Sequence, residues 1–379
     1  MEMMSGLASD GRTVIVVTHS VANLGICDRL LVLVPGGKVA YFGPPDDGLR
    51  HFGQPGWAQV FRAFEAEPDR DWAGEYRRSA YCAQYAVVSQ ASRPAVTAPG
   101  AAAAPPPRPQ TRLAQLSTLI RRYLAVIASD RNFVAALALL PIILGAVIRV
   151  VPAPQGLTGT NNGNAIQVLL ILILAACLTG VANAVRELVK ERTIYGRERA
   201  AGLSAGAYLF SKLLVLGLIT GAQAAVLVAL GVVGKPLPAH GSLLPALPEL
   251  LLAIVVLAIA CMALGLLVSA IVNTSEKTMP VLVLLSMAQV ILSGGLLALS
   301  VGLNQLSWLT PARWGFAATA STVNLNVISA PGVITRSSLW DHKPSAWLMD
   351  MGLQILLAVL FSLVAWWRLV RLSPGRTRR

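Results

Sequence analysis

The chain from residue 133 onward contains six long apolar runs separated by polar links. A helix needs about 20 mostly apolar residues to cross roughly 30 Å of hydrocarbon at a rise of 1.5 Å per residue. Each run is about that long or longer, so the pattern predicts six membrane-spanning helices. The runs cover Phe133–Val151, Ala165–Val185, Ala207–Val233, Leu247–Val272, Met279–Leu299 and Ala346–Leu369.

A densely charged stretch, Arg186–Ser204, separates the second run from the third and reads RELVKERTIYGRERAAGLS. It is too charged to lie in lipid, so it predicts a loop between two spans. Its excess of Lys and Arg over Asp and Glu places it on the cytoplasmic side. The basic residues that follow the fourth and sixth runs favour the same side. The pattern therefore predicts a multi-pass protein of the plasma (inner) membrane with both termini in the cytoplasm.

Two shorter helices are predicted beside the spans. Thr111–Asp130 has apolar residues at helical spacing and arginines off that stripe, which is typical of a basic amphipathic helix that contacts membrane lipids in the interface. In the link before the last span, Trp308–Ala320 begins with Thr310 as a plausible N-cap and Pro311 at the first helical position. This predicts a short re-entrant or interfacial helix, with Trp308 and Trp314 at head-group depth.

The first 45 residues have a different pattern, that of an α/β domain. Thr13–Thr18 (TVIVVT) is a continuous β-branched run typical of a strand buried in a parallel sheet, and His19 stands at its end. A short helix, Val21–Arg29, and two strands, Leu30–Val34 and Lys38–Phe42, are predicted next. Gln90–Gln110 is rich in Pro and Ala and predicts an extended or disordered linker. The predicted boundaries are 1–55, 56–110, 111–131, 132–372 and a basic tail at 373–379.

Composition narrows the classes of protein further. Of the 379 residues 55% are hydrophobic and 13% charged, and the mean hydropathy is +0.63, so an ordinary soluble domain is excluded. The net charge of +13 could indicate nucleic-acid binding. However, the arginines lie beside apolar runs, where they set topology and contact anionic lipid, so no nucleic-acid partner is expected. The four cysteines form no CxxC pair, and no metal site is predicted.

His19 carries the first chemical hypothesis. A histidine at the carboxyl end of a parallel strand lies where α/β sheets bind ligands, although a surface histidine is the alternative. The surrounding strings are more specific: TVIVVTHS, CDRLLVL, PGGKVAYFGPP, WAGEYRRSAYCAQY, RLAQLSTLIRRYLAVIASDR, ELVKERTIYGRERAAGLSAGAYLFSK, QVILSGGL and LTPARWGFAA. In this order, over nearly the whole chain, they resemble ABC transporters of the G type, the white/pleiotropic-drug-resistance subfamily. Among bacterial relatives the chain looks most like actinobacterial proteins with forkhead-associated domains upstream.

The resemblance implies a mostly α fold: a six-span ABC-2/G-type transmembrane domain preceded by the C-terminal remnant of an α/β nucleotide-binding domain. His19 would be the switch histidine that contacts the γ-phosphate of ATP. The phosphate loop, the LSGGQ signature and the Walker B carboxylates are not found in this sequence; in the family they precede that histidine. We therefore expect this chain alone to bind neither ATP nor Mg²⁺ and to hydrolyse no ATP. It resembles a longer gene product truncated at its N-terminus, or a reading frame that starts at an internal Met.

The resemblance also assigns roles within the membrane part. The charged loop takes the position of the family's coupling helix, which docks on the nucleotide-binding domain; a solvated turn is the alternative. The second and fifth spans would line a cavity between two protomers, whereas helix–helix hydrogen bonding is the alternative for their polar residues. The candidate coupling residues are Glu187, Glu191, Arg192, Arg197, Glu198 and Arg199. The candidate substrate-path residues are Asn183, Gln289, Ser293, Gly294 and Gly295.

The resulting hypothesis is the permease part of an ATP-driven exporter of an amphipathic or lipid-like substrate. It implies a complete nucleotide-binding domain and a second protomer, in a homodimer or a heterodimer. The alternative is a nonfunctional fragment or a membrane interaction protein without transport activity. A channel or proton-coupled carrier is disfavoured, because this interpretation takes spans two to five as free of carboxylates and Asp350 as interfacial.

Overall fold

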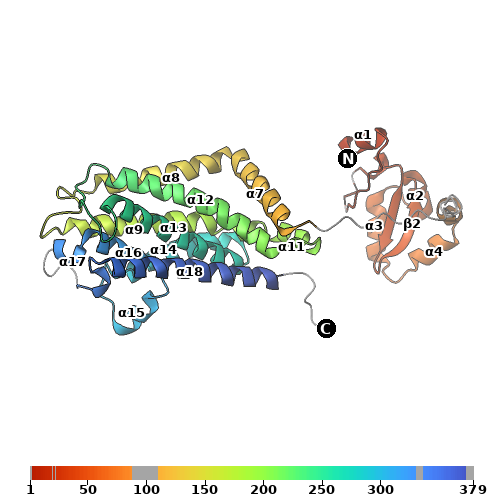
Figure 1. The fold of residues 1–379 in the computed structure, drawn as a ribbon. Helices are drawn as coiled ribbons and strands as arrows, with labels where there is room; N and C mark the ends of the chain where they lie inside the picture. The colour runs from red at the N-terminus through yellow and green to blue at the C-terminus, as the bar shows by residue number, and fades with distance from the viewer. Residues whose placement is uncertain (1, 19, 22, 88–109, 330–335, 373–379) are drawn as a thin grey trace. The chain divides into compact units, whose positions relative to one another are not determined.

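The computed structural model describes residues 2–18, 20–21, 23–87, 110–329 and 336–372 (Figure 1). The chain divides into two compact units, Met1–Pro106 and Pro107–Arg379, and each is described by itself. His19 and nearly all of the predicted linker lie outside the described residues.

The first unit contains a small antiparallel sheet surrounded by short helices. Strands β1 (Leu30–Val34) and β2 (Lys38–Gly43) pair from Leu30 opposite Gly43 to Val34 opposite Lys38. The turn between them contains two glycines, both at positive φ. The flanking elements are α1 (Glu2–Ser9), a 3₁₀ turn at Leu24–Ile26, α2 (Pro45–Phe52), α3 (Trp57–Ala66), α4 (Trp72–Arg78), α5 (Ala80–Cys82) and a π-helical turn at Ala83–Val87.

The predicted strand Thr13–Thr18 is wrong for this structure. These residues have no regular secondary structure, and the side chains of Ile15 and Val17 are 87% and 99% exposed. A strand buried on both faces needs a neighbouring strand and covering helices. In the described part of this unit the sheet has only β1 and β2, which pair with each other. Among the described residues of the predicted helix Val21–Arg29, only the 3₁₀ turn at Leu24–Ile26 is helical.

Aromatic side chains form the core of the first unit. Tyr41 on β2 is fully buried, and its hydroxyl donates to the Pro44 carbonyl at 2.8 Å. Trp57, Trp72 and Tyr76 pack around it from α3 and α4. Helices α2 to α4 are too short to be stable alone, so this shared aromatic contact is what holds them against the hairpin.

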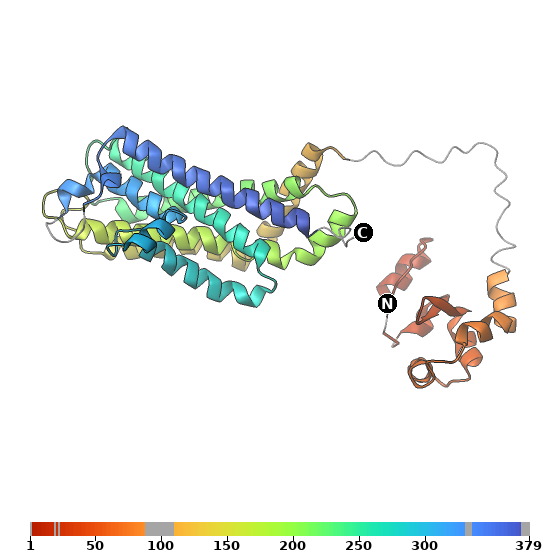
Figure 2. The same cartoon turned by 90° about the horizontal axis from the view of Figure 1, so that it is seen from below.

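The second unit is a bundle of long apolar helices that run side by side in both views (Figures 1 and 2). Six helical segments in the described residues are long and apolar enough to cross a membrane, which confirms the predicted number of spans. The long helices are α8 (Arg131–Val150), α9 (Asn164–Ala184), α12 (Ala205–Val232), α13 (Ala246–Ile271), α14 (Thr278–Leu292) and α18 (Pro344–Arg371). The shorter elements are α7 (Arg112–Ser129), α10 (Glu187–Lys190), α11 (Arg192–Ala200), α15 (Val301–Ser307), α16 (Pro311–Val323), α17 (Leu325–Ile328) and 3₁₀ turns at Ser275–Lys277 and Ser338–Trp340.

Helices α9 and α13 form the centre of the bundle through small residues. A Cβ added to Gly180 on α9 would lie 2.2 Å from the Ala258 carbonyl oxygen on α13. One at Gly265 would lie 3.0 Å from the Ala184 Cβ. Small residues let two backbones approach closely, and close packing is the main source of helix association in lipid.

The fifth span ends seven residues earlier than predicted. Helix α14 ends at Leu292, because Gly294 adopts a positive φ of 79° that helices do not continue through. The two glycines after Ser293 also leave room for α16. A Cβ on Gly294 would lie 1.9 Å from Arg313 Nη1, and one on Gly295 would lie 2.4 Å from the Phe316 ring.

The predicted helix at residues 308–320 forms as α16, but it is buried inside the bundle. Its residues Pro311, Ala312 and 314–323 are buried, and it packs on α9, α13 and α18. Trp308 remains exposed, whereas Trp314 is buried and its indole N–H donates to the Trp308 carbonyl at 3.0 Å. Trp314 therefore does not lie at the surface of the bundle.

Two carboxylates correct the interpretation that the spans lack buried acids. Glu249, in the first turn of α13, is fully buried and accepts from the amides of Ser242, Leu243 and Leu244 and from the Thr322 hydroxyl, at 2.8–3.0 Å. Asp350, near the start of α18, is also fully buried among the helices. The sequence interpretation overlooked Glu249 within the fourth predicted run. It recognised Asp350, but hydropathy does not show that the helix face carrying this residue is covered.

Candidate coupling site

The charged stretch folds into two short helices, α10 and α11, at one end of the bundle between α9 and α12. Helix α10 is anchored to α13, because the Ser269 hydroxyl accepts from the amides of Leu188 and Val189 at 2.9 and 3.1 Å. Helix α12 begins at Ala205, and its N-cap Ser204 accepts from the Ala207 amide through its side chain. Helices α10 and α12 are thus each fixed near their start by a side-chain hydrogen bond.

A group of charged side chains, centred on the buried Glu187, joins these two helices to their neighbours. The Glu187 carboxylate, 2% exposed, accepts from the Tyr123 hydroxyl and the Lys190 ammonium, and from Lys212 Nζ at 3.0 Å. Lys212, also 2% exposed, donates to Glu191 as well, at 2.9 Å. We call these residues, together with Tyr208, the Glu187 cluster.

The Glu187 cluster is balanced in charge and tightly bonded. Two carboxylates face two ammonium groups, and the Tyr208 hydroxyl donates to Glu191 at 2.9 Å. The Lys212 ammonium also lies 3.5 Å from the centre of the Tyr123 ring, a favourable cation–π contact. Burial and the Glu187 carboxylate raise the pKa of the Tyr123 phenol, so it stays protonated and remains a donor.

The cluster joins three parts of the chain that are far apart in sequence. Tyr123 comes from α7, Glu187 from α10 and Lys212 from α12. Helix α7 is also bonded to the end of α11: Arg122 forms an ion pair with Glu198, and the Gln115 side chain accepts from the Ser204 amide at 2.9 Å. Buried ion pairs hold one geometry, because either charge left alone in the interior is costly. Helices α7, α10, α11 and α12 should therefore move together.

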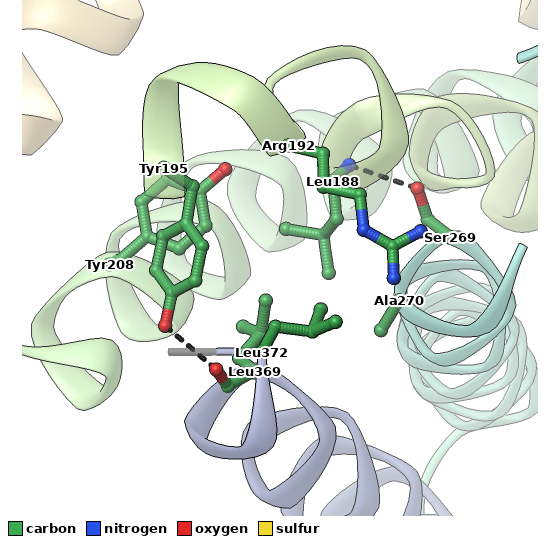
Figure 3. Close-up of a pocket in the computed structure, with 8 residues that line it drawn as sticks. All are labelled: Leu188, Arg192, Tyr195, Tyr208, Ser269, Ala270, Leu369 and Leu372. Carbon is green, nitrogen blue, oxygen red and sulfur yellow. Dashed lines mark hydrogen bonds between the residues drawn. The ribbon is translucent and has the colours of Figure 1, made fainter. Parts of the chain in front are cut away.

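A small cavity lies beside the cluster (Figure 3). Its volume is about 10 Å³, room for one water at most, so it is no ligand site. The Tyr195 hydroxyl donates to the Leu369 carbonyl at 3.1 Å, which ties α11 to the end of α18. The lining residues are Leu188, Arg192, Tyr195, Tyr208, Ser269, Ala270, Leu369 and Leu372.

Most of the predicted coupling residues are bonded within their own unit. Glu187, Glu191 and Glu198 are paired as above; Arg192 donates to the Val272 carbonyl and to Asn273 at 3.2 and 3.0 Å, and Arg199 to the Leu203 carbonyl. Arg197 is exposed.

Sequence reasoning missed Tyr123, Tyr208 and Ser269, which carry no distinctive sequence signal. Lys212 did have one, as the only charge in its apolar run.

The predicted substrate-path residues also make bonds inside the bundle. The Asn183 amide donates to Thr220 and Gln223 at 2.8 and 2.5 Å, and Gln223 donates to the Leu137 carbonyl at 2.6 Å. These bonds link α9, α12 and α8, which favours the helix–helix alternative without testing the path itself.

Gln289 and Ser293 likewise make local bonds. The side chain of Gln289 on α14 accepts from the Ala312 amide at 3.0 Å, so it caps the start of α16. Ser293 donates to the Val290 carbonyl at 2.7 Å and accepts from Gly295. Across the described residues, no group of three or more His, Cys, Asp or Glu is placed to hold a metal ion.

The segment that contains these elements matches a known family. Residues 114–323, from α7 to the end of α16, match the model of the ABC-2 type transporter family. The chain belongs to the ABC-2 type transporter family. It is therefore a multi-pass membrane protein, and the six long helices are its spans.

One curated relative extends the similarity to almost the whole chain. The ABC transporter ATP-binding/permease protein Rv1747 of Mycobacterium tuberculosis (strain ATCC 25618 / H37Rv) is 38% identical over 379 residues, 97% of this chain. The chain spans 42% of that relative's length.

Proposed function

We propose that this chain is the permease part of an ATP-driven exporter, and that the end of the bundle carrying α10 and α11 receives the motion of a nucleotide-binding domain. The family and the relative, whose name includes both ATP-binding and permease functions, support a transporter. The observation that carries the coupling role is the Glu187 cluster. It bonds the short helices α10 and α11 to the spanning helix α12, so a force on α11 is passed on to α12.

The predicted coupling residues fall into two groups, one bonded inside the end of the bundle and one exposed on α11. Glu187 and Glu191 hold the helices together from inside and are not free to pair with another domain. The exposed face of α11, with Thr193, Ile194, Arg197 and Ala200, is open to contact. We propose that this face docks on the nucleotide-binding domain, and that Arg197 supplies its charge.

The remaining parts of the proposal concern the whole transporter. ATP and Mg²⁺ would bind in a complete nucleotide-binding domain, with His19 contacting the γ-phosphate. Closure of two such domains requires a second protomer. The charged end and both termini would face the cytoplasm, because a motor driven by cellular ATP works there, and the positive-inside pattern agrees. The substrate would be amphipathic or lipid-like, in keeping with an apolar bundle.

Protection of α11 tests this docking. Ile194→Cys, in a chain joined to a complete nucleotide-binding domain, should react with a membrane-impermeant maleimide at least about tenfold more slowly than in the chain alone, because a docked surface excludes the reagent. Arg121→Cys, on an exposed position of α7, serves as the control and should react at similar rates in both. Equal labelling of Ile194→Cys in both proteins would favour the alternative, a solvated turn in a membrane protein without a motor.

A further inference from the structure

Asp350 is a buried acid without a hydrogen-bonding partner. It lies six residues after Pro344, roughly 9 Å along α18 at a rise of 1.5 Å per residue. The residue is fully buried, and within the described part of the chain neither carboxylate oxygen has a partner. Glu249, equally buried, contrasts with it because four donors surround its carboxylate.

The other unpartnered polar atoms gather around Asp350. Six buried side-chain atoms in the described residues lack a partner, and five of them belong to Arg313, Trp347, Asp350 and Gln354. Trp347 and Gln354 lie three residues before and four after Asp350, on the same face of α18. That face packs on α13 and α16. Chance unpaired atoms would be scattered through the bundle, whereas these are concentrated at one junction.

Arg313 is a half-buried cation on α16, the helix that packs on α18 beside Asp350's face. Its guanidinium lies over Gly294 and donates to Asn304 at 3.1 Å, while its Nε has no partner. No ion pair within 4.0 Å joins it to Asp350 in the described residues. The two opposite charges therefore stand on helices that pack together, but they do not pair with each other in this arrangement.

The chemistry of the two groups decides which of them is neutral. A guanidinium does not lose its proton in proteins, whereas a carboxylate buried without donors in an apolar bundle takes one up. Of the two groups, Asp350 is therefore the one that can exchange a proton. A shift of α16 toward α18 would let Arg313 pair with the carboxylate and favour its ionised form instead.

We propose that Asp350 is a proton-exchange site: it carries a proton in this arrangement of α16 and α18, and on giving that proton to water it forms an ion pair with Arg313. No other bond changes, and one protonated water leaves for each carboxylate formed. The other charged groups near these elements are Glu249 at the start of α13 and Asp341, His342 and Lys343 before α18. This inference does not depend on the proposed export function.

Dicyclohexylcarbodiimide is a suitable probe, because it is apolar and reacts with protonated carboxyl groups in membranes. The whole chain in lipid nanodiscs is treated over a range of pH, and modified peptides are quantified by mass spectrometry. We expect Asp350 to be labelled at neutral pH, and the rate to fall about tenfold per pH unit once the acid ionises. Glu249 is the internal control, since four donors enclose its carboxylate, and we expect it to stay unlabelled. No labelling of Asp350 at any pH, or labelling independent of pH, would overturn the proposal.

Two variants test the partner. Arg313→Gln removes the cation and should move the loss of Asp350 labelling to higher pH by at least about one unit, whereas Arg313→Lys should stay close to the parent chain. Lys343→Gln and His342→Gln remove groups near the start of α18 and should leave the profile unchanged. If Arg313→Gln gives the parent profile, or if His342→Gln shifts it instead, Arg313 is not the partner. A size-exclusion profile like that of the parent confirms that each variant is folded.

Discussion

Replacing Lys212 with methionine is expected to lower the free energy of unfolding of the helical bundle by about 3–5 kcal/mol. The lysine is 2% exposed, and its ammonium is bonded to Glu187 and Glu191. Methionine keeps most of the volume but leaves the buried Glu187 carboxylate with Lys190 as its single cation, and it removes the ammonium from the half-buried Glu191. Denaturant unfolding of the purified chain in detergent, followed by circular dichroism, measures the effect.

Lys190 provides the matched control for this substitution. It binds the same carboxylate, but its side chain is 42% exposed, so Lys190→Met should cost about 1 kcal/mol or less. Adding Glu187→Gln to Lys212→Met should restore part of the stability, because a neutral amide no longer needs a buried cation. If Lys212→Met costs no more than Lys190→Met, the cluster does not hold the bundle end together.

Replacing Gly180 with alanine is the second change with a large expected effect. The new Cβ would lie 2.2 Å from a backbone carbonyl of α13, which cannot move aside as a flexible side chain can. Helices α9 and α13 must separate, at a cost of about 1–3 kcal/mol in unfolding free energy. The same unfolding assay measures it.

Gly217 on α12 is the control for Gly180. The nearest atom to a Cβ there is the end of the Met262 side chain at 3.8 Å, which is ordinary contact. Gly217→Ala should change stability by about 0.5 kcal/mol or less. Equal effects of the two alanines would show that the close α9–α13 contact does not limit stability.

The sequence predicts the spans well because their signal is local. Each span must satisfy its own backbone hydrogen bonds in lipid, so a long apolar run is nearly sufficient to predict a helix there. The end of α14 was misplaced by seven residues, because the apolar run continues past Gly294 while the backbone turns at its positive φ. The prediction of a strand at residues 13–18 failed because a strand, unlike a spanning helix, forms its hydrogen bonds with neighbouring strands that its own sequence does not contain.

The contacts of the candidate coupling site were also not predictable from local sequence. The sequence located the charged loop and marked Glu187 and Glu191 as distinctive, but it assigned them to contacts with another domain. The structure turns both inward, toward Tyr123 of α7 and Lys212 of α12. Side-chain direction in a short helix depends on the packing of its neighbours, which no local pattern encodes. The burial of Asp350 could not be predicted for the same reason, since it depends on the packing of α16 against α18.

The placement of the charged end in the cytoplasm is the central claim, and two-sided labelling tests it most directly. Arg197→Cys and Lys235→Cys lie beyond opposite ends of α12. Each is introduced into a chain whose four native cysteines, Cys27, Cys82, Cys177 and Cys261, have been replaced. Sealed vesicles of known orientation are treated with an impermeant maleimide. We expect Arg197→Cys to react only from the cytoplasmic side and Lys235→Cys only from the other. Labelling of Arg197→Cys from the outer side, or of both from one side, would contradict the account.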